Sequence, residues 1–380
     1  MKHVKKVLII QAEVKQYRVS FYEKLFTVLK EKGIDLIVAY SAPNSLQKMK
    51  GDNVELDSRI GRNVKGYWFI NNKIMFQNVI TLIAQADLII VEQANKYIVN
   101  YLLLIIAMLR LKKIAYWGHG RNMQAEGKNR FREYFKKKLT TMVDWWFAYT
   151  KISSHHVASL GFPKEKITII QNTIDTKELD KDLSSVNEQG IKELKKSMNI
   201  NSENICIYCG GIYRDKKIEF LLESSIDIRK YIKDFHLIII GSGPLDYIIK
   251  EVSKRHSWIH YLGPVMGMAK APYFRMSKAI LMPGLVGLAI VDSFVAGMPL
   301  ITTDLKIHSP EISYLENGKN GIMTSFSKED YVKSVVNYLR SEELQEILRA
   351  GCLRSADKYS MDNMVNNFKN GIINCLFRVN

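Results

Sequence analysis

The feature that most constrains the fold is an alternation of short β-branched, apolar runs with longer helical patterns. A buried strand followed by a helix, repeated along the chain, is typical of a parallel sheet covered by helices on both faces. The runs predict strands at residues 6–11, 34–40, 87–91, 113–117, 145–149, 166–170, 205–209, 236–240, 258–262, 279–282 and 299–302.

Helical patterns lie between these runs, and a polar break separates two halves. At 380 residues the chain is too long for one ordinary hydrophobic core. We therefore expect an α/β protein of two Rossmann-like, doubly wound domains that face a central cleft. The boundaries would be 1–180 for the first domain, 181–204 for a linker, 205–355 for the second domain, and 356–380 for a helix packing back toward the first. Helices are expected at 18–32, 74–85, 96–111, 128–142, 151–160, 217–232, 245–255, 268–277, 288–296 and throughout 328–377.

The net charge of +17 indicates a negatively charged partner, which could be nucleic acid, anionic lipid or a phosphate-rich ligand. An AT-rich genome, which favours Lys, Asn and Ile codons, is the alternative explanation. A nucleic-acid-binding protein should carry interleaved aromatic residues or a recognisable module, and the sequence has neither. We therefore expect no nucleic acid partner.

Metal and redox sites are not expected. Cys206 and Cys209 form a C-x-x-C on a predicted strand, where positions i and i+3 face opposite sides of the sheet. The one D-x-D, Asp180 to Asp182, falls in the polar segment and reads as surface charge.

No membrane-spanning or secretory segment is expected. The longest apolar segment, 97–109, is shorter than the roughly 20 residues that span a bilayer. The N-terminus lacks the small-residue cleavage site of a signal peptide. The sequence therefore predicts a cytoplasmic protein.

Loops after strands are the places to look for chemistry, because ligands of open α/β sheets bind at the carboxyl ends of the strands. In "YCGGIYRDKKIEFLLES", glycines precede Arg214 and Lys216 at a helix start, which suits a diphosphate. In "LIIIGSGPLDY", Gly241 and Gly243 make half of a dinucleotide fingerprint, and a sharp turn is an equal explanation.

The stretch "PGLVGLAIVDSFVAGMPLITTD" holds a single acid, Asp292, among apolar residues. A helix should begin near Gly287 or Leu288, which puts the carboxylate about one turn from its N-terminus. There it could accept hydrogen bonds from a ribose diol, since an unpaired buried carboxylate is costly. A structural aspartate bonded to nearby backbone is the alternative.

Five motifs in order resemble the family 4 glycosyltransferases, which are retaining enzymes with the two-domain GT-B fold. They are "GGIYRDKKIEFLL", "IIIGSGP", "IHYLGPV", "AILMPGLVGLAIVDSFVAGMPLITTD" and "PEISYLENGKNGIM", and they cover most of 205–325. The resemblance implies that Lys216 binds the donor's diphosphate and that Asp292 holds the ribose hydroxyls. It also implies that residues 286–288 meet the sugar and phosphates, and that 263–265 contact the nucleobase.

Two positions depart from the family pattern. Gly284 stands where the family has a glutamate that contacts the donor sugar, and Gly211 stands where a basic residue is usual. Arg214 is a candidate substitute for the latter. The loss at Gly284 leaves open a non-catalytic sugar-nucleotide-binding subunit as the alternative function.

The first domain carries weaker signals. Tyr17 and Arg18 follow the first strand and are candidate acceptor-binding residues. His119, between Gly118 and Gly120, lies where the family often has a histidine near the donor sugar. Two basic amphipathic stretches, 96–113 and 128–139, could contact an anionic membrane. For 96–113 a helix packed on the sheet is the alternative.

The sequence thus predicts a retaining glycosyltransferase of bacterial surface polysaccharide synthesis, with a UDP- or GDP-linked sugar as donor and a glycan or lipid-linked acceptor. The first domain would bind the acceptor and the second the nucleotide-sugar, without cofactor or metal. An anionic surface at the inner face of the cell membrane is a candidate further partner. The catalytic candidates are His119, Lys216 and Arg214. The donor-binding candidates are Gly211, Gly241, Gly263, Val265, Gly284, Val286, Gly287, Leu288 and Asp292.

Overall fold

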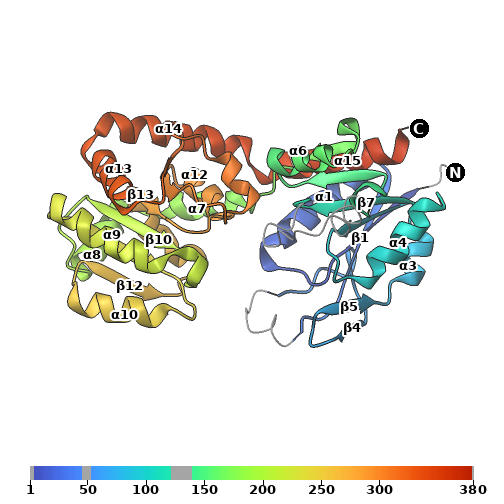
Figure 1. Cartoon of the computed structure of the whole chain (residues 1–380), viewed down its shortest axis with the longest axis horizontal. Coiled ribbons are helices and arrows are strands. Elements are labelled where there is room, and N and C mark those ends of the chain that lie inside the picture. The colour runs from blue at the N-terminus through green and yellow to red at the C-terminus, as the bar shows by residue number, and fades with distance from the viewer. Residues whose placement is uncertain (1–3, 45–52, 121–138, 379–380) are drawn as a thin grey trace. The chain divides into compact units, whose positions relative to one another are not determined.

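The computed structural model describes residues 4–44, 53–120 and 139–378. The chain divides into two compact units (Figure 1). Unit 1 comprises Met1–Ile174 together with Met361–Asn380, and unit 2 comprises Asp175–Ser360.

The predicted domain boundaries are corrected by this division. The segment expected to be a linker, 181–204, lies inside unit 2 and is largely helical, in α7 (Thr176–Ser185) and α8 (Glu188–Ser197). The polar composition that suggested a linker belongs to surface helices, and α7 still buries Leu179 and Leu183 against its own unit.

Unit 1 is built on a parallel sheet of seven strands in the order β3-β2-β1-β6-β7-β8-β9. Every neighbouring pair in this sheet runs parallel. The strands are β1 (Lys5–Ile10), β2 (Ile34–Tyr40), β3 (Gly61–Asn63), β6 (Leu88–Glu92), β7 (Lys113–Gly118), β8 (Trp145–Ala148) and β9 (Ile167–Ile169).

Helices pack on both faces of this sheet. One core joins α1 (Val19–Lys30) and α15 (Met361–Phe377) to one face. A second core joins α3 (Ile80–Gln85), α4 (Ile98–Met108) and α6 (Lys151–Ser159) to the other face. Alternate residues of β1 enter the two cores, as expected for a strand buried on both sides.

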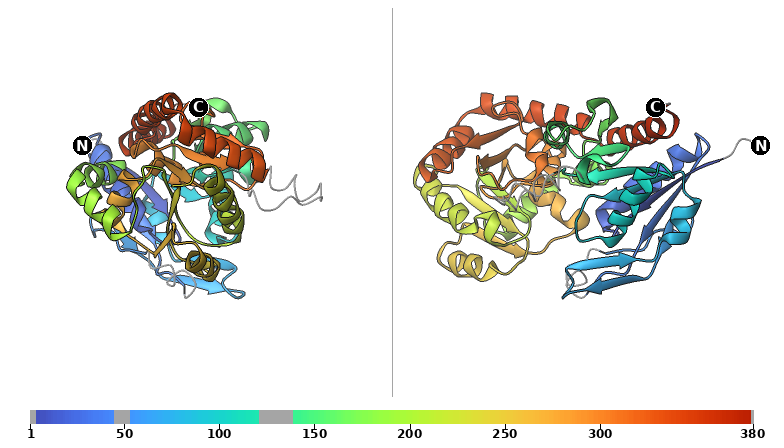
Figure 2. Two further views of the ribbon diagram at one scale, coloured as in Figure 1. Left: turned by 90° about the vertical axis from the view of Figure 1, so that its left-hand side faces the viewer. Right: turned by 45° about the vertical axis from the view of Figure 1, so that its right-hand side comes forward.

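The last helix of the chain belongs to the first unit. Both Figure 1 and the right-hand view of Figure 2 draw α15, in red, beside the green and blue elements of unit 1. Its Phe368 is fully buried and stacks on Phe147 with ring centroids 4.2 Å apart. Phe21 and Trp117 meet the same ring edge-on, at 5.2 and 5.0 Å. The chain end thereby closes the core over β7 and β8.

Unit 2 repeats the design with a parallel sheet of six strands in the order β12-β11-β10-β13-β14-β15. The strands are β10 (Ile205–Cys209), β11 (His236–Ile240), β12 (Ile259–Gly263), β13 (Ala279–Leu281), β14 (Leu300–Thr303) and β15 (Gly321–Thr324). Its further helices are α9 (Ile218–Tyr231), α10 (Asp246–Arg255), α11 (Ala271–Arg275), α12 (Ala289–Val295), α13 (Lys328–Arg340) and α14 (Glu342–Lys358). Short 3-10 turns along the chain are η1 (Gln16–Arg18), η2 (Lys164–Lys166), η3 (Arg214–Lys216), η4 (Gly267–Lys270) and η5 (Pro310–Tyr314).

The predicted fold class is confirmed, and every strand expected from the sequence is present within a residue or two of its predicted bounds. The helix expected at 74–85 is partly wrong. Its first part is β5 (Ile74–Gln77), which pairs antiparallel with β4 (Gly66–Phe69). This hairpin, in light blue, extends from unit 1 in Figure 2. The helix expected at 128–142 lies mostly outside the described residues.

The strand order of the unit 2 sheet determines where the loops after β10 and β13 lie. In unit 2 the chain leaves β10 toward β11 on one side and later returns through β13 on the other side of β10. The loops after β10 and β13 therefore diverge at their carboxyl ends, which is where open α/β sheets bind ligands. These are the loops that hold Lys216 and Gly284.

Replacing Phe368 by Ala should destabilise unit 1 by about 3–5 kcal/mol, because it removes a fully buried ring from an aromatic cluster. Urea unfolding followed by tryptophan fluorescence measures this, since four of the five tryptophans lie in unit 1. Phe377→Ala, at an exposed position of the same helix, should change stability by less than about 0.5 kcal/mol. A loss below about 1 kcal/mol for Phe368→Ala would contradict the packing.

Candidate functional site

The loops at the carboxyl end of the unit 2 sheet pack on one another through their backbones. The N–H of Leu285 donates to the carbonyl of Asp215 at 2.8 Å. The N–H of Ile212 donates to Ser242 at 3.0 Å. The site is therefore built from main chain that leaves little room for side chains.

Three glycines make this close approach possible. A Cβ on Gly241 would lie 1.9 Å from the Gly210 carbonyl oxygen, and one on Gly243 would lie 2.2 Å from that of Ile212. A Cβ on Gly284 would lie 2.3 Å from the Asp215 carbonyl oxygen. Gly284, the position where the family pattern has a carboxylate, thus has a steric reason to be glycine in this chain.

Lys216 is the buried cation of the site. Lys216 is the last residue of η3, and the residue is only 7% exposed. The ammonium donates to the carbonyl of Leu285 at 2.6 Å and lies 3.7 Å from the sulfur of Met282. Burial lowers the pKa of Lys216 from 10.5 to about 8, although Asp215 and Cys209 favour the charged form.

An ammonium group has three N–H donors, and one carbonyl and one sulfur occupy two of them here. A partly desolvated cation with a donor to spare, held at the end of a parallel sheet, is suited to an anionic group.

Asp292 is the buried anion of the site. Its side chain on α12 is 16% exposed, and Oδ2 lies 3.6 Å from the ammonium of Lys270. Its Oδ1 is buried and has no hydrogen-bond partner among the residues that the structure describes. Burial raises the pKa of this carboxyl, while Lys270 opposes the rise. An unsatisfied carboxylate oxygen of this kind is suited to a hydroxyl donor.

The pKa of the Cys209 thiol, at the end of β10, responds to the charges of both Lys216 and Asp292. Burial raises the pKa of Cys209 to about 11, Asp292 adds to the rise, and Lys270 and Lys216 oppose it. All three charged groups are thus close enough to act on one thiol. Lys216 and Asp292, the two side chains on which the sequence prediction of a nucleotide site depended, follow the neighbouring strands β10 and β13 at the carboxyl end of one sheet.

His308 organises the loop before α12. Its Nδ1 accepts from the N–H of Val286 at 3.0 Å, and its Nε2 contacts the carbonyl oxygen of Thr303 at 2.7 Å. These partners require a neutral ring protonated on Nε2. Burial lowers the pKa of His308, which agrees with the neutral form. The N–H of Val286 is consequently occupied, so this part of its predicted phosphate contact is corrected.

The remaining predicted residues of unit 2 surround this centre. Arg214 is exposed, whereas Lys216, two residues later, is buried. The Gly211 carbonyl accepts from the hydroxyl of Tyr208 at 2.6 Å. Gly263 ends β12 with φ of 71°, and Val265 follows it, half-buried.

The helix start predicted at Gly287 or Leu288 is close to the observed one. Leu288 is the N-cap of α12, and the helix begins at Ala289. A Cβ on Gly287 would lie 3.5 Å from the nearest atom, the hydroxyl oxygen of Ser309, so this glycine is not sterically required.

The predicted residues of unit 1 also come together, at the carboxyl end of its own sheet. The Arg18 guanidinium lies 5.0 Å from the ring of Tyr17 and 5.8 Å from that of Tyr149. His119 meets Tyr149 edge-on at 4.4 Å and is exposed. Arg18 itself is 7% exposed and donates to Asn172 at 2.6 Å. Tyr17 and His119 therefore form the accessible part of this cluster, and the buried Arg18 packs against the Tyr17 ring.

Two polar residues of the unit 2 site escaped the sequence analysis. Lys270, on η4 after β12, pairs with Asp292, and His308, after β14, fixes Val286. Both lie in loops that follow strands, which is the signal that could have identified them. Within residues 4–44, 53–120 and 139–378, no group of His, Cys, Asp and Glu is arranged to hold a metal ion.

The comparisons with known proteins agree with this architecture. Residues 203–341 match the family model described as "Glycosyl transferases group 1". The alpha-monoglucosyldiacylglycerol synthase of Acholeplasma laidlawii is 28% identical over 206 residues, which are 52% of this chain and 50% of that protein. The chain therefore spans about half the length of this curated relative.

Solved structures resemble nearly the whole chain. A glycosyltransferase from Rickettsia africae ESF-5 has a TM-score of 0.70 at 13% identity, covering 99% of both chains. Anabaena Alr3699/HepE, solved in complex with UDP, has a TM-score of 0.69 at 11% identity, covering 97% of this chain and 99% of that one. The chain has the GT-B fold, and its residues 203–341 are similar to the group 1 glycosyltransferases.

Gly284→Ala should lower the free energy of unfolding of unit 2 by about 1–3 kcal/mol, because the new methyl group would clash with the backbone of Asp215 and Lys216. Gly287→Ala in the same loop is the matched control and should cost less than about 0.5 kcal/mol. Chemical unfolding of both variants measures the difference. Equal stability of the two proteins would show that the close approach at Gly284 is not required.

Proposed function

We propose that the chain is a glycosyltransferase that takes a sugar from a nucleotide-diphospho-sugar and passes it to a hydroxyl of an acceptor. One observation carries this proposal: a buried ammonium, Lys216, and a buried carboxylate with a free oxygen, Asp292, lie in the segments that follow β10 and β13, at the switch point of the unit 2 sheet. Diphosphate and ribose are the adjoining groups of a nucleotide that need such a cation and such an anion.

Lys216 supplies the catalytic electrostatics in this proposal. Negative charge builds on the diphosphate as it leaves the sugar, and a fixed cation in a desolvated place stabilises that charge. The carbonyl of Leu285 holds the ammonium at 2.6 Å, so little reorganisation is needed during the reaction. No divalent ion is required for this role, because Lys216 provides the positive charge.

Asp292 orients the nucleoside. Its unpaired Oδ1 accepts from a ribose hydroxyl, and Oδ2 remains near Lys270. Ligand binding thus removes the cost of an unsatisfied buried oxygen, which makes a ribonucleotide preferable to a deoxyribose analogue.

We propose UDP as the nucleotide and a lipid-linked or glycan acceptor. The UDP complex of Alr3699/HepE supports the first part of this proposal, and the name of the Acholeplasma relative, which describes a glycolipid synthase, supports the second. In this proposal the accessible Tyr17 and His119 meet the acceptor and the sugar. The family resemblance supports retention of anomeric configuration, a role in bacterial surface polysaccharide synthesis, and work at the inner face of the cell membrane.

A non-catalytic nucleotide-binding subunit is the second candidate. It is favoured by Gly284, which stands where the family has a glutamate that contacts the donor sugar. A structural reason for this glycine weakens that argument. The close approach of Gly284 to Asp215 gives this glycine a structural reason of its own. The missing carboxylate is therefore compatible with an active enzyme whose donor sugar is held by other groups.

The experiment that tests the proposed function has two stages. Calorimetric titration with UDP-, GDP- and ADP-sugars identifies the donor, and incubation with labelled donor and bacterial lipid extract measures transfer. We expect binding of one donor and a labelled product. Asp292→Asn should weaken UDP by about tenfold and 2′,3′-dideoxy-UDP much less. Donor binding without any transfer or hydrolysis would favour the non-catalytic subunit, and no nucleotide binding would contradict both candidates.

The affinity for UDP should fall as the pH rises above about 8, which is the pKa to which burial lowers Lys216. Above that pH the free protein holds a neutral Lys216, and binding a diphosphate requires the uptake of one proton. The dissociation constant should therefore rise by up to about tenfold between pH 8 and 9. The diphosphate itself keeps a constant charge there, since its last ionisation lies near pH 6.

Calorimetric titration across this range measures the slope. Lys216→Met should bind UDP weakly and lose the pH dependence. Lys217→Met, at the neighbouring lysine, is the matched control and should retain it. A slope that persists in Lys216→Met would contradict the assigned role of this ammonium.

A further inference from the structure

Helix α4 of unit 1 is apolar on both of its faces. Val99, Leu103 and Leu104 are buried in the core on the sheet. The residues that face away from that core recur at helical spacing and are also apolar, yet exposed: Ile98, Tyr101, Leu102, Ile105, Met108 and Leu109. Amphipathic surface helices normally turn charged residues to the solvent, so an apolar outer face implies a partner.

A strongly basic pocket of about 800 Å³ lies next to the end of α4. Two carboxylates line it, Asp87 and Asp144. Six cations line it, giving a net charge of +4: Lys5, Arg110, Lys112, Lys113, Lys166 and Arg378.

The pocket lies at the amino edge of the unit 1 sheet. Lys5 and Lys113 are the first residues of β1 and β7, and Asp87 and Lys166 directly precede β6 and β9. The amino ends of parallel strands meet at one edge of a sheet, which is the edge opposite the cluster of Tyr17 and His119. The pocket is thus separate from the predicted acceptor end of this unit.

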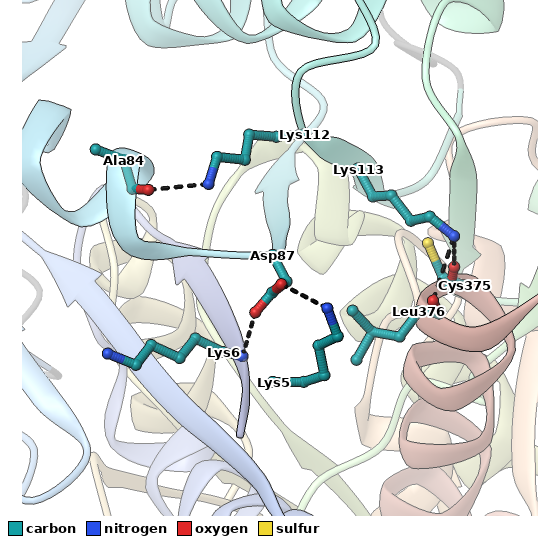
Figure 3. Close-up of polar contacts among 8 residues, drawn as sticks. All are labelled: Lys5, Lys6, Ala84, Asp87, Lys112, Lys113, Cys375 and Leu376. Carbon is teal, nitrogen blue, oxygen red and sulfur yellow. Dashed lines mark hydrogen bonds and ion pairs between the residues drawn. The ribbon is translucent and has the colours of Figure 1, made fainter. Parts of the chain in front are cut away.

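Internal contacts account for only part of this charge (Figure 3). Asp87 pairs with Lys5 at 2.8 Å and also accepts from the N–H of Lys6. Lys112 and Lys113 donate to neutral carbonyls, those of Ala84 at 2.9 Å and Cys375 at 2.7 Å, and so keep their charge uncompensated.

Arg110 and Lys166 differ from the other cations of the pocket in their contacts. Neither side chain makes a hydrogen bond or ion pair within the part of the chain that the structure describes. Arg110 is also exposed, so these two charges are available to an external anion.

The apolar face and the basic pocket are continuous along the chain. Leu109 is the C-cap of α4, and the next two residues, Arg110 and Leu111, line the pocket. Leu111 is itself 64% exposed, between two basic residues. Aliphatic side chains beside cations are the combination that binds the boundary between acyl chains and anionic headgroups.

We propose that unit 1 docks on an anionic lipid bilayer through this surface, with the outer face of α4 among the acyl chains and the basic pocket on the headgroup phosphates. Among the described residues no helix is long and apolar enough to cross a membrane, so the contact is one of a helix lying in the interface. A second copy of a chain with net charge +17 would be repelled at the same pocket.

Docking does not depend on the proposed chemistry. It would raise the local concentration of the protein at a surface that carries lipid-linked acceptors, but the binding itself involves no nucleotide. Its test therefore uses vesicles alone, and the outcome is independent of whether UDP binds to unit 2.

The test is co-sedimentation of the full chain with vesicles of phosphatidylcholine alone or mixed with phosphatidylglycerol. We expect binding to the anionic vesicles that weakens at high salt. Ile105→Ser, Met108→Ser and Leu109→Ser combined change side chains that are 55%, 66% and 63% exposed, so the fold should persist. This triple variant should bind at least about tenfold more weakly. Tyr247→Ser with Ile347→Ser, at exposed apolar positions of unit 2, should bind as the parent does.

A second variant tests the contribution of the basic pocket to vesicle binding. Arg110→Gln with Lys166→Gln should weaken binding to anionic vesicles by about thirtyfold and reduce its salt dependence. Lys233→Gln with Lys333→Gln, at exposed lysines of unit 2, is the control of equal charge. Thermal unfolding of all variants verifies that the fold is intact.

Vesicle binding that is unaffected by both unit 1 variants would overturn the proposal. So would equal binding to neutral and anionic vesicles, or a dimer in light scattering that the triple variant dissociates, which would identify a second copy as the occupant of the α4 face.

Discussion

The site depends on one contact between two stretches of main chain. Leu285 donates its N–H to the carbonyl of Asp215 and accepts from the ammonium of Lys216 with its own carbonyl. Both bonds require the loop after β13 to lie directly on the turn after β10, and Gly284 is the residue that allows it. A side chain there would separate the loops and release the lysine. Backbone approach, more than any side-chain pair, therefore fixes the position of the buried cation.

The two charged groups of the site are both destabilised by burial. Burial makes the charged form of Lys216 less favourable and the charged form of Asp292 less favourable too, so both groups carry a cost that a ligand of opposite polarity would relieve. Lys270 compensates Asp292 only on one oxygen, at 3.6 Å. A protein that retains two such groups around one thiol is better explained by binding than by stability, because apolar residues would cost less.

Much of this could be predicted from the sequence, for identifiable reasons. Continuous β-branched runs such as 34–40 and 205–209 specify strands buried on both faces, and these were predicted with their observed bounds. The β4–β5 hairpin was missed because its pairing is tertiary. Ile74–Gln77 alternates between partly and fully buried residues only once it lies against β4, and its turn runs through left-handed Asn71 and Asn72.

Some residues of the candidate site could be predicted from the sequence, and others could not. Lys216 and Asp292 could be selected because each follows a strand at a spacing typical of nucleotide-sugar enzymes. Lys270 and His308 could not, since their roles arise from loops that the sheet order brings together. Gly284 was predicted as a lost carboxylate, whereas the structure adds the close contact that excludes any side chain at that position.

The most direct test is a crystal structure of the protein with UDP. We predict one UDP at the carboxyl end of the β10–β13 pair, with a β-phosphate oxygen within hydrogen-bonding distance of the Lys216 ammonium and a ribose hydroxyl on Oδ1 of Asp292. UDP bound elsewhere, or bound without contact to the Lys216 ammonium and to Oδ1 of Asp292, would contradict it.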